Sequence, residues 1–280
     1  MGWESSLIAI TGMELEALEE VISIIKTGGN FDFGGYARQS LRRRILHFVS
    51  QQNLTLPEFV EKLKLGQVNI GHLVQSVTVN YTEMFRDPDF FKFLRKDLFV
   101  YLNSFPFIRV WSAGCASGEE TFSLLIILRE LDLESKSFTY ATDVSMKVIK
   151  QARDGMLPLS KLKTYSENYM LSEGTSSLSD YYEVMYEQAY IRNEIRKKAL
   201  FAIHNLNGDG VFNEFNLILC RNVMIYFTNE QRVLVLKKLY DSLMIFGFLC
   251  LGKRESLHDT GLESYFKIYN KELNIFQKVK

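Results

Sequence analysis

The sequence has few of the features that metal sites, nucleic-acid binding and membrane insertion require. Its 280 residues include three cysteines and four histidines, and neither set has the spacing of metal ligands. The 33 basic and 33 acidic residues cancel, so no overall field attracts nucleic acid or a membrane surface. No apolar run approaches the roughly 18 residues of a membrane helix, and the N-terminus lacks a signal-peptide pattern. We therefore expect a cytoplasmic protein without a metal, a nucleic-acid partner or direct membrane insertion.

The periodicity of apolar residues changes along the chain and predicts two domains. Residues 1–80 read as helical, with helices expected at 13–26, at 36–51 and from Thr55, where Pro57 and Glu58 complete a helix-start signature. A further helix is expected to start at Asp87-Pro88 and to run to about residue 102. We predict a small, all-helical N-terminal domain over residues 1–80.

From residue 107 onward the pattern alternates between strands and helices. Alternation of this kind predicts a mostly parallel sheet covered by helices on both faces, so the fold class is α/β and Rossmann-like over residues 81–280. The alternation fails between residues 155 and 198, and we expect an inserted subdomain at about 165–198. Strands are predicted at 107–113, 137–142, 199–203, 216–221 and 246–251, helices at 119–132, 145–153 and 228–243, and a closing hairpin at 265–269 and 273–279.

A glycine-rich turn joins the first predicted strand to the helix that follows. The segment reads Val110-Trp-Ser-Ala-Gly-Cys-Ala-Ser-Gly-Glu-Glu-Thr-Phe-Ser123, and the next strand ends in Asp143. This is the nucleoside-binding layout of an open α/β sheet. A dinucleotide would place its pyrophosphate on the helix N-terminus, where Glu119 and Glu120 would repel it. A ligand with a ribose, a positive charge and no phosphate fits better, and S-adenosylmethionine is such a ligand.

Several residues near this turn admit two interpretations. Asp143 follows Gly118 by 25 positions, near the spacing at which an acid binds ribose hydroxyls. An acid after a strand is often only a helix cap, but Ser145 is available to cap the next helix, which would free Asp143. Glu119 and Glu120 also suit a helix N-terminus on dipole grounds alone. A ligand role for either glutamate and a purely structural role are about equally supported.

Two further segments combine polar and aromatic residues. A buried strand delivers Cys220-Arg221-Asn222 to the same edge of the sheet as the glycine-rich turn, and Tyr226 follows shortly after. Taken alone, Tyr226 suits a core aromatic. The segment Asn80-Tyr-Thr-Glu-Met-Phe-Arg86 precedes a predicted helix, so its polar residues suit either ligand binding or helix capping.

Together these three segments resemble the CheR family, the methyltransferases that methylate glutamates of chemotaxis receptors. The resemblance covers nearly the whole chain and implies a Rossmann-like, S-adenosylmethionine-dependent methyltransferase domain behind a small helical domain. It implies that S-adenosylmethionine is the cofactor and S-adenosylhomocysteine the product. It also implies cofactor contacts at Asn80, Thr82, Arg86, Glu120, Asp143, Asn205, Leu206, Asn222 and Val223, and it places Arg86 and Tyr226 at the reacting methyl group.

Two departures from the family pattern lie near the site. Family members usually carry Gly-His-Ser-Glu after the late strand, where this chain has Gly252-Lys-Arg-Glu255. They carry Pro-Tyr-Ser after the paired glutamates, where this chain has Thr121-Phe-Ser123. The first departure puts contacts at the rim of the site in doubt, and neither removes a cofactor or catalytic position.

The expected partner is the acidic, glutamate-bearing cytoplasmic helical region of a membrane chemoreceptor. Residues 33–57 contain Arg38, Arg42, Arg43, Arg44 and His47 and no acidic residue. Arg38 and Arg42 share one helix face. Such a face is usually only solvated, but the resemblance makes it the receptor contact. Some family members also bind a receptor C-terminal tail on an inserted β-subdomain, for which residues 165–198 are the candidate.

The sequence leaves two other functions open. One is a Rossmann methyltransferase that acts on another substrate, and the other is a catalytically silent, cofactor-binding adaptor for receptors. The retained Arg86 and Tyr226 argue against the adaptor, and the basic N-terminal helix argues against a small-molecule substrate. The expected chemistry needs no general base, because a glutamate with an ordinary pKa of about 4.3 is already ionised at neutral pH.

Overall fold

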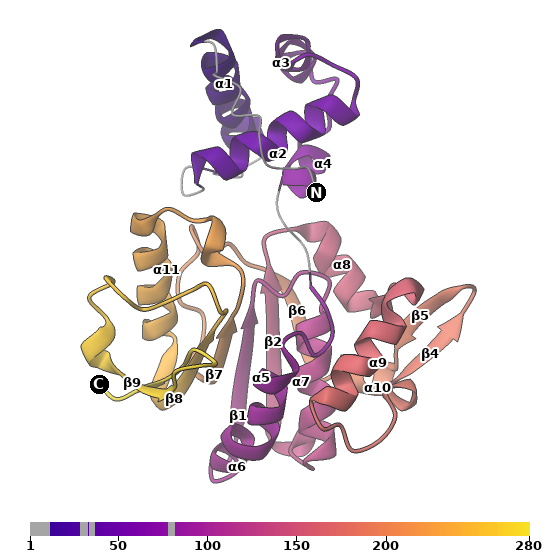
Figure 1. The fold of residues 1–280 in the computed structure, drawn as a ribbon, viewed down its shortest axis with the longest axis vertical. Coiled ribbons are helices and arrows are strands. Elements are labelled where there is room, and N and C mark those ends of the chain that lie inside the picture. The colour runs from indigo at the N-terminus through magenta and orange to yellow at the C-terminus, as the bar shows by residue number, and fades with distance from the viewer. Residues whose placement is uncertain (1–11, 29–32, 34–36, 78–81) are drawn as a thin grey trace, which may run out of the picture. The chain divides into compact units, whose positions relative to one another are not determined.

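The structure is a computed structural model that describes residues 12–28, 33, 37–77 and 82–280, except for the side chains of residues 12–15, 75 and 226. Its backbone forms two compact units. One comprises residues 1–79 with 226–228, and the other comprises residues 80–225 with 229–280. The helices α1 to α4 belong to the first unit and the strands to the second (Figure 1).

The first unit is helical, as the sequence predicts. Its helices are α1 (Gly12–Gly28), α2 (Arg38–Gln51), α3 (Leu56–Lys64) and α4 (Ile70–Val77). The predicted start of α3 is confirmed as a capping box, in which the Thr55 N–H donates to Glu58 Oε2 over 2.8 Å and the Glu58 N–H donates to the Thr55 hydroxyl. The short α4 is not predicted from the sequence. Buried apolar residues from these helices form the core, among them Val21, Ile25, Leu41, Ile45, Phe48, Phe59, Leu63 and Leu73.

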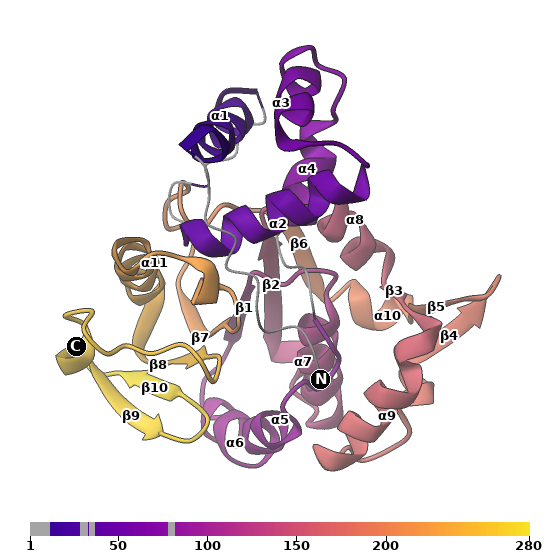
Figure 2. The same cartoon turned by 45° about the horizontal axis from the view of Figure 1, so that its top comes forward.

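The second unit is built on a seven-stranded sheet in the order β6-β2-β1-β7-β8-β10-β9 (Figures 1 and 2). The strands from β6 to β8 are parallel, and β10 is antiparallel to β8 and to β9. The predicted strands and the closing hairpin are confirmed, although β8 begins three residues earlier than expected. The bounds are β1 Ile108–Ala113, β2 Ser137–Asp143, β6 Ala199–Ile203, β7 Phe215–Cys220, β8 Leu243–Leu251, β9 Phe266–Asn270 and β10 Ile275–Lys278.

The order of the strands determines where a ligand can bind. The chain runs from β1 to β2 to β6 on one side and then returns to place β7 on the other side of β1. Loops that leave the carboxyl ends of β1 and β7 therefore diverge, and open α/β sheets bind ligands at this switch point. The glycine-rich turn, Asp143 and Asn222 all follow carboxyl ends of strands in this region.

Helices pack against the sheet where the alternating pattern predicts them. Helix α7 (Glu119–Glu130) packs on β2, α8 (Met146–Asp154) on β2 and β6, and α11 (Asn229–Asp241) on β8. The helix predicted to start at Asp87-Pro88 comprises α5 (Pro88–Phe93), a π-helical turn (Leu94–Leu98) and α6 (Phe99–Leu102). The buried core of this unit includes Val110, Phe122, Ile126, Leu217 and Phe248.

A second, smaller sheet lies within the segment where the alternation fails. Strands β3 (Met156–Leu157), β5 (Gln188–Ile191) and β4 (Tyr182–Met185) form an antiparallel sheet in that order. Helix α9 (Leu162–Leu171) lies between β3 and β4 in the sequence, and the single-turn helix α10 (Asn193–Arg196) follows β5. The first strand of this small sheet thus precedes residue 165.

Glu130, at the end of α7, anchors the inserted segment to the helices that precede the sheet. Its carboxylate pairs with Arg95 and accepts hydrogen bonds from the hydroxyl groups of Tyr169 and Tyr181, the latter over 3.0 Å. The Thr175 hydroxyl and N–H also donate to it, over 3.0 and 3.2 Å. Only 3% of the Glu130 side chain is exposed, so these contacts are buried and join the inserted segment to the rest of the unit.

Candidate functional site

The glycine-rich turn after β1 is held by the end of β2 and contacts the loop after β7. The Gly114 N–H donates to the Thr142 carbonyl over 2.8 Å, and the Ala116 N–H donates to Asp143 Oδ2 over 3.0 Å. Gly114 has a φ of 76°, and a Cβ atom there would lie 2.4 Å from Val223 Cγ2. Glycine is therefore required both for the left-handed backbone and for the close approach of the second loop.

Asp143 ends β2, and its two carboxylate oxygens accept backbone hydrogen bonds from the Ala116 N–H and from the Ser145 N–H, the latter over 2.9 Å. The prediction that Ser145 caps α8 and frees Asp143 is wrong, because the Ser145 side chain makes no capping bond and its hydroxyl has no hydrogen-bond partner among the described residues. Burial raises the pKa of Asp143, and the two N–H groups oppose that rise. Each oxygen can still accept a second bond, as ribose binding requires.

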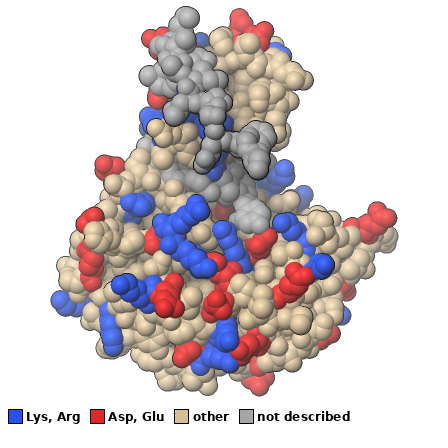
Figure 3. Space-filling model, viewed as in Figure 1, with Lys and Arg blue, Asp and Glu red and all other residues tan. Residues whose placement is uncertain are grey.

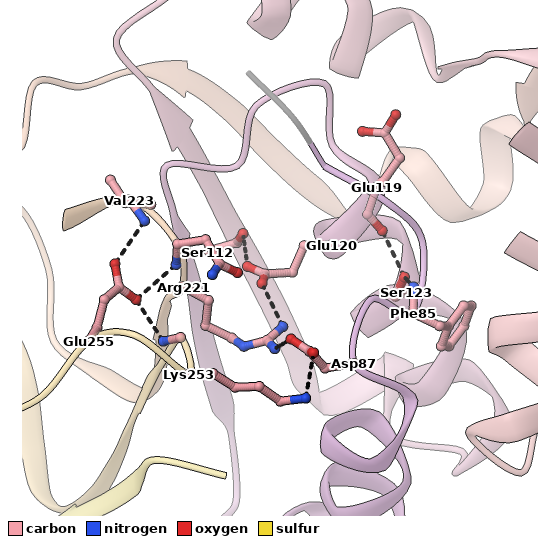
Figure 4. Close-up of polar contacts among 12 residues, drawn as sticks. Phe85, Asp87, Ser112, Glu119, Glu120, Ser123, Arg221, Val223, Lys253 and Glu255 are labelled. Atoms are coloured by element: carbon pink, nitrogen blue, oxygen red, sulfur yellow. Dashed lines mark hydrogen bonds and ion pairs between the residues drawn. The ribbon is translucent and has the colours of Figure 1, made fainter. Parts of the chain in front are cut away.

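The two glutamates at the start of α7 lie in different surroundings (Figure 4). Glu120 Oε1 accepts a hydrogen bond from the Ser112 hydroxyl over 3.0 Å, and its other oxygen lies 3.3 Å from Arg221. Burial raises the pKa of Glu120, while the positive charges of Arg221 and Arg86 favour its ionised form. The Glu120 carboxylate thus faces two arginines beside the glycine-rich turn.

Glu119 is enclosed by hydroxyl groups instead of cations. Its carboxylate accepts hydrogen bonds from Ser117 over 2.7 Å and from Tyr165 over 3.4 Å, and 2% of the residue is exposed. Burial raises its pKa to about 7. At neutral pH this group is therefore less ionised than an exposed glutamate. The repulsion of a phosphate that the sequence predicts from Glu119 is weakened accordingly.

Arg221 links the site's separate segments through ion pairs of its buried guanidinium. It follows β7 and its guanidinium lies 2.7 Å from Asp87 and 3.3 Å from Glu120, with 3% of the side chain exposed. The guanidinium also lies 3.9 Å from the centre of the Phe90 ring. No role for Arg221 was predicted from the sequence, although a charged residue directly after an apolar strand is a signal for a buried ion pair.

The loop that carries Arg86 has an unusual backbone. The residues on either side, Phe85 and Asp87, have φ values of 52° and 59°, in the left-handed region that residues other than glycine rarely adopt. The Phe85 N–H donates to the Ser123 hydroxyl over 2.8 Å, and the Asp87 carboxylate pairs with Arg221. Contacts on both sides therefore compensate for the strain and fix the backbone of Arg86.

The remaining predicted cofactor residues follow strands of the same sheet or precede Arg86. Asn205 and Leu206 follow β6, where the Asn205 side chain accepts the N–H of Asn207 over 2.9 Å. Thr82 is half-buried at the start of the Arg86 loop. Asn80 and the side chain of Tyr226 lie outside the described residues, although the Tyr226 backbone ends the 3-10 turn Met224–Tyr226.

The departure from the family pattern after β8 has a structural role in this chain. Lys253 extends the ion-pair network, because its ammonium lies 2.9 Å from Asp87 (Figure 4). Glu255, at a position where the family pattern also has glutamate, accepts backbone hydrogen bonds from the loop that contains Asn222 and Val223. The sequence pattern predicted neither contact, because both join residues that are far apart in the chain.

The two predicted receptor-binding arginines lie on α2 in the first unit. Arg38 is exposed and forms an ion pair with Glu19 of α1 over 3.2 Å, whereas Arg42 is half-buried. Arg44 donates to the Val77 carbonyl over 2.9 Å and therefore has a structural contact within the unit. The arginines of α2 thus differ in their surroundings.

The described part of the chain contains no group of three or more histidine, cysteine, aspartate or glutamate residues arranged to hold a metal ion. Within the same residues, no helix has the length and apolar character needed to cross a membrane.

The raised pKa of Glu119 predicts a pH-dependent stability. The unfolded carboxyl titrates near pH 4.3 and the folded one near pH 7, so the folded state binds more protons between these values. Stability conferred by this group is therefore lost as pH rises through that window. Glutamine at 119 stays neutral at every pH. Between pH 5 and pH 8 the wild type should therefore lose about 3 kcal/mol of unfolding free energy that Glu119→Gln keeps. Chemical denaturation at several pH values measures this difference, and a pH-independent difference would contradict the assignment.

Comparisons with known proteins agree with this geometry. Residues 80–274 match the family described as the CheR methyltransferase, SAM binding domain. The chain is 35% identical over 269 residues to a Pseudomonas putida protein named putative methyltransferase Cher3, with 96% of this chain and 97% of that protein covered. It is 31% identical over 238 residues to the chemotaxis protein methyltransferase of Listeria innocua, with 84% and 87% covered. It is also 31% identical over 221 residues to that of Vibrio parahaemolyticus, with 74% and 75% covered.

The matched region includes the glycine-rich turn, Asp143, Arg221 and Glu255, and the sheet has the predicted Rossmann-like architecture. The site contains carboxylates that suit a ribose and a cation, which agrees with the predicted cofactor. The chain therefore belongs to the CheR methyltransferase family, and it is an S-adenosylmethionine-dependent methyltransferase.

Proposed function

We propose that this enzyme methylates glutamate side chains on the acidic cytoplasmic helices of membrane chemoreceptors, with formation of glutamate methyl esters. The observation that carries the proposal is the fixed position of Arg86, whose loop is held between the Ser123 contact and the Asp87–Arg221 ion pair. An arginine whose backbone is held in this way, and whose charge acts on Glu120 beside the cofactor turn, suits an incoming carboxylate. The proteins of Listeria and Vibrio to which the chain is similar are named chemotaxis protein methyltransferases.

The residues proposed to hold the cofactor come from five segments of the second unit: the loop before α5, the start of α7, the end of β2, and the loops after β6 and β7. Asp143 offers acceptor oxygens for the ribose hydroxyls, and Glu120 offers a negative charge near the glycine-rich turn. When bound, S-adenosylmethionine supplies a methyl group activated by a positive sulfonium. The full proposed set is Asn80, Thr82, Arg86, Glu120, Asp143, Asn205, Leu206, Asn222 and Val223.

The protein's own contribution to the reaction is to bind, orient and exclude water. The substrate carboxylate is ionised at neutral pH, so no residue has to remove a proton. Arg86 holds the carboxylate, and the Tyr226 hydroxyl orients it toward the methyl group. The negative charge of the carboxylate and the positive charge of the donor disappear together, so a site that excludes water favours the transfer. Positioning supplies much of the remaining rate enhancement.

The product explains how methylation can act as a signal. The ester is neutral, so each transfer removes one negative charge from the receptor helix. Loss of a charge changes how an acidic helix repels or pairs with its neighbours, as other charge-changing modifications do.

Receptor recognition is proposed to use the basic face of α2. Arg38 and Arg42 occupy positions one turn apart on this helix, and both carry charges opposite to those of the receptor. The chain as a whole has no net charge, and basic and acidic side chains are interspersed on the face of the larger unit shown in Figure 3. A local basic face on α2 would therefore contribute more to recognition than a long-range field.

A methyl-transfer assay tests the reaction. We expect the wild type to transfer the labelled methyl group of S-adenosylmethionine to a receptor cytoplasmic fragment, and not to the same fragment with its glutamates replaced by glutamine. Arg86→Ala should lower the single-turnover rate by about 100-fold or more at saturating cofactor, because it removes the charge that holds the carboxylate. Tyr226→Phe should cause a smaller loss, since no proton moves. Equal labelling of the two fragments by the wild type would refute the glutamate assignment.

A matched pair of double variants tests the receptor contact. Arg38→Ala with Arg42→Ala removes two charges from α2, and Lys62→Ala with Lys64→Ala removes two from α3. Each pair includes one residue that is ion-paired to α1, Arg38 to Glu19 and Lys64 to Glu20. The α2 variant should slow receptor methylation by roughly 3–10-fold at low salt, with a smaller effect at high salt, because screening weakens exposed charges.

The α3 variant should methylate at the wild-type rate, and both should bind S-adenosylhomocysteine normally. Equal rates for the two double variants at low salt would show that the α2 face is only solvated surface.

A further inference from the structure

Glu255 is a buried carboxylate that is held by backbone N–H groups of two loops. One oxygen accepts from Gly252 over 2.6 Å and from Asn222 over 2.8 Å. The other accepts from Val223 over 2.9 Å and from Met224 over 2.7 Å. Only 3% of Glu255 is exposed. Hydrogen bonds from N–H groups to an ionised carboxylate are about twice as strong as neutral ones, so this set fixes the loop firmly.

The backbone of the loop after β7 is shaped to surround this carboxylate. Asn222 has a φ of 61°, in the left-handed region, and the N–H groups of residues 222, 223 and 224 all point to Glu255. Successive N–H groups form a concavity for an anion when one residue adopts a left-handed conformation. The carboxylate therefore stabilises a conformation that asparagine would otherwise adopt only at a cost in energy.

The loop after β8 brings Glu255 close to Asn222. A Cβ atom on Gly252 would lie 2.7 Å from the Asn222 nitrogen and 2.7 Å from Glu255 Oε2, so only glycine permits this approach. The Asn274 side chain donates to the carbonyls of Gly252 and Glu255 over 3.0 and 3.1 Å. The Glu255 segment is thus fixed from β8 and from the start of β10.

The position of this loop is transmitted to the glycine-rich turn. Val223 packs so closely on Gly114 that a Cβ atom on that glycine would meet the Val223 side chain. Gly114 is in turn held to the end of β2 by its bond to Thr142. A displacement of Val223 would therefore also displace the turn that precedes Glu119 and Glu120. It would move the neighbouring Asn222 as well.

We infer that Glu255 is a positioning residue for the cofactor site. It holds the backbone of residues 222–224 so that Asn222 and Val223 meet the cofactor and the turn at Gly114 remains closed by Val223. Glu255 acts through the loop and does not itself touch the cofactor. The inference rests on the proposed assignment of Asn222 and Val223 to cofactor contact.

The test compares Glu255→Gln with Glu130→Gln. Both replace a buried carboxylate that accepts several hydrogen bonds in the same unit, but Glu130 lies at the opposite end of α7 from the glycine-rich turn. Glutamine at 255 turns an amide group toward N–H donors and leaves at least one of them without a partner. We expect the dissociation constant of S-adenosylhomocysteine, measured by calorimetry, to rise about tenfold or more for Glu255→Gln, the equivalent of one charge-assisted hydrogen bond.

Glu130→Gln should lower the melting temperature and leave that dissociation constant within about twofold of the wild-type value. Thermal unfolding and far-ultraviolet circular dichroism of both variants show how much of the folded state each one retains. The methylation rate of Glu255→Gln at low cofactor should fall more than its rate at saturating cofactor.

Wild-type affinity for S-adenosylhomocysteine in folded Glu255→Gln would overturn the inference, whatever its melting temperature. If that variant does not fold, Glu255→Asp gives the same readout, because it keeps the charge but is too short to reach both loops. Unchanged affinity in Glu255→Asp would also overturn it. Cofactor binding is measured without a receptor, so the result is independent of the proposed substrate.

Discussion

The buried arginine Arg221 holds together the segments that carry the proposed site. Its guanidinium pairs with Asp87, from the loop of Arg86, and with Glu120, from the start of α7. A buried arginine without partners would be costly, so these segments are constrained to lie where their carboxylates meet it. The pair with Asp87 also helps to hold a left-handed residue next to Arg86. The geometry of the proposed catalytic loop thus depends on a residue that follows β7.

Four carboxylates around the glycine-rich turn have different roles because their surroundings differ. Glu120 faces arginines, Glu119 faces hydroxyl groups and has a pKa of about 7, and Asp143 and Glu255 accept backbone N–H groups. Of these, Glu120 and Asp143 are proposed to meet the cofactor. Glu255 shapes the loop opposite them. A list of acidic residues would not separate these roles, but their partners do.

The fold could be predicted from local patterns in the sequence, and much of the network in the site could not. Strand–helix alternation and the glycine-rich turn are properties of neighbouring residues, and they predicted the sheet and the region of the cofactor. The short α4 was missed because eight residues with an internal glycine give a weak helical signal. The individual site residues were named through the family resemblance, and their contacts with cofactor and substrate remain predictions.

Contacts between distant residues account for most of what was missed. Arg221 and Asp87 are 134 residues apart, and Glu255 and Asn222 are 33 apart, so no spacing rule connects them. The expected cap at Ser145 was wrong for a related reason. A rule for helix starts cannot anticipate that Asp143 itself accepts the Ser145 N–H and bonds to the preceding turn. Sequence patterns located the loops, but long-range hydrogen bonds and ion pairs determine how the loops are held.

The Arg221 ion pairs hold the cofactor turn and the Arg86 loop in place for binding. The most direct measurement is the affinity of Arg221→Lys for S-adenosylhomocysteine. Lysine keeps the charge but lacks the planar fork that reaches both Asp87 and Glu120. We expect a folded protein whose dissociation constant is raised by about tenfold or more. A folded Arg221→Lys variant with wild-type affinity would contradict this role of the ion pairs.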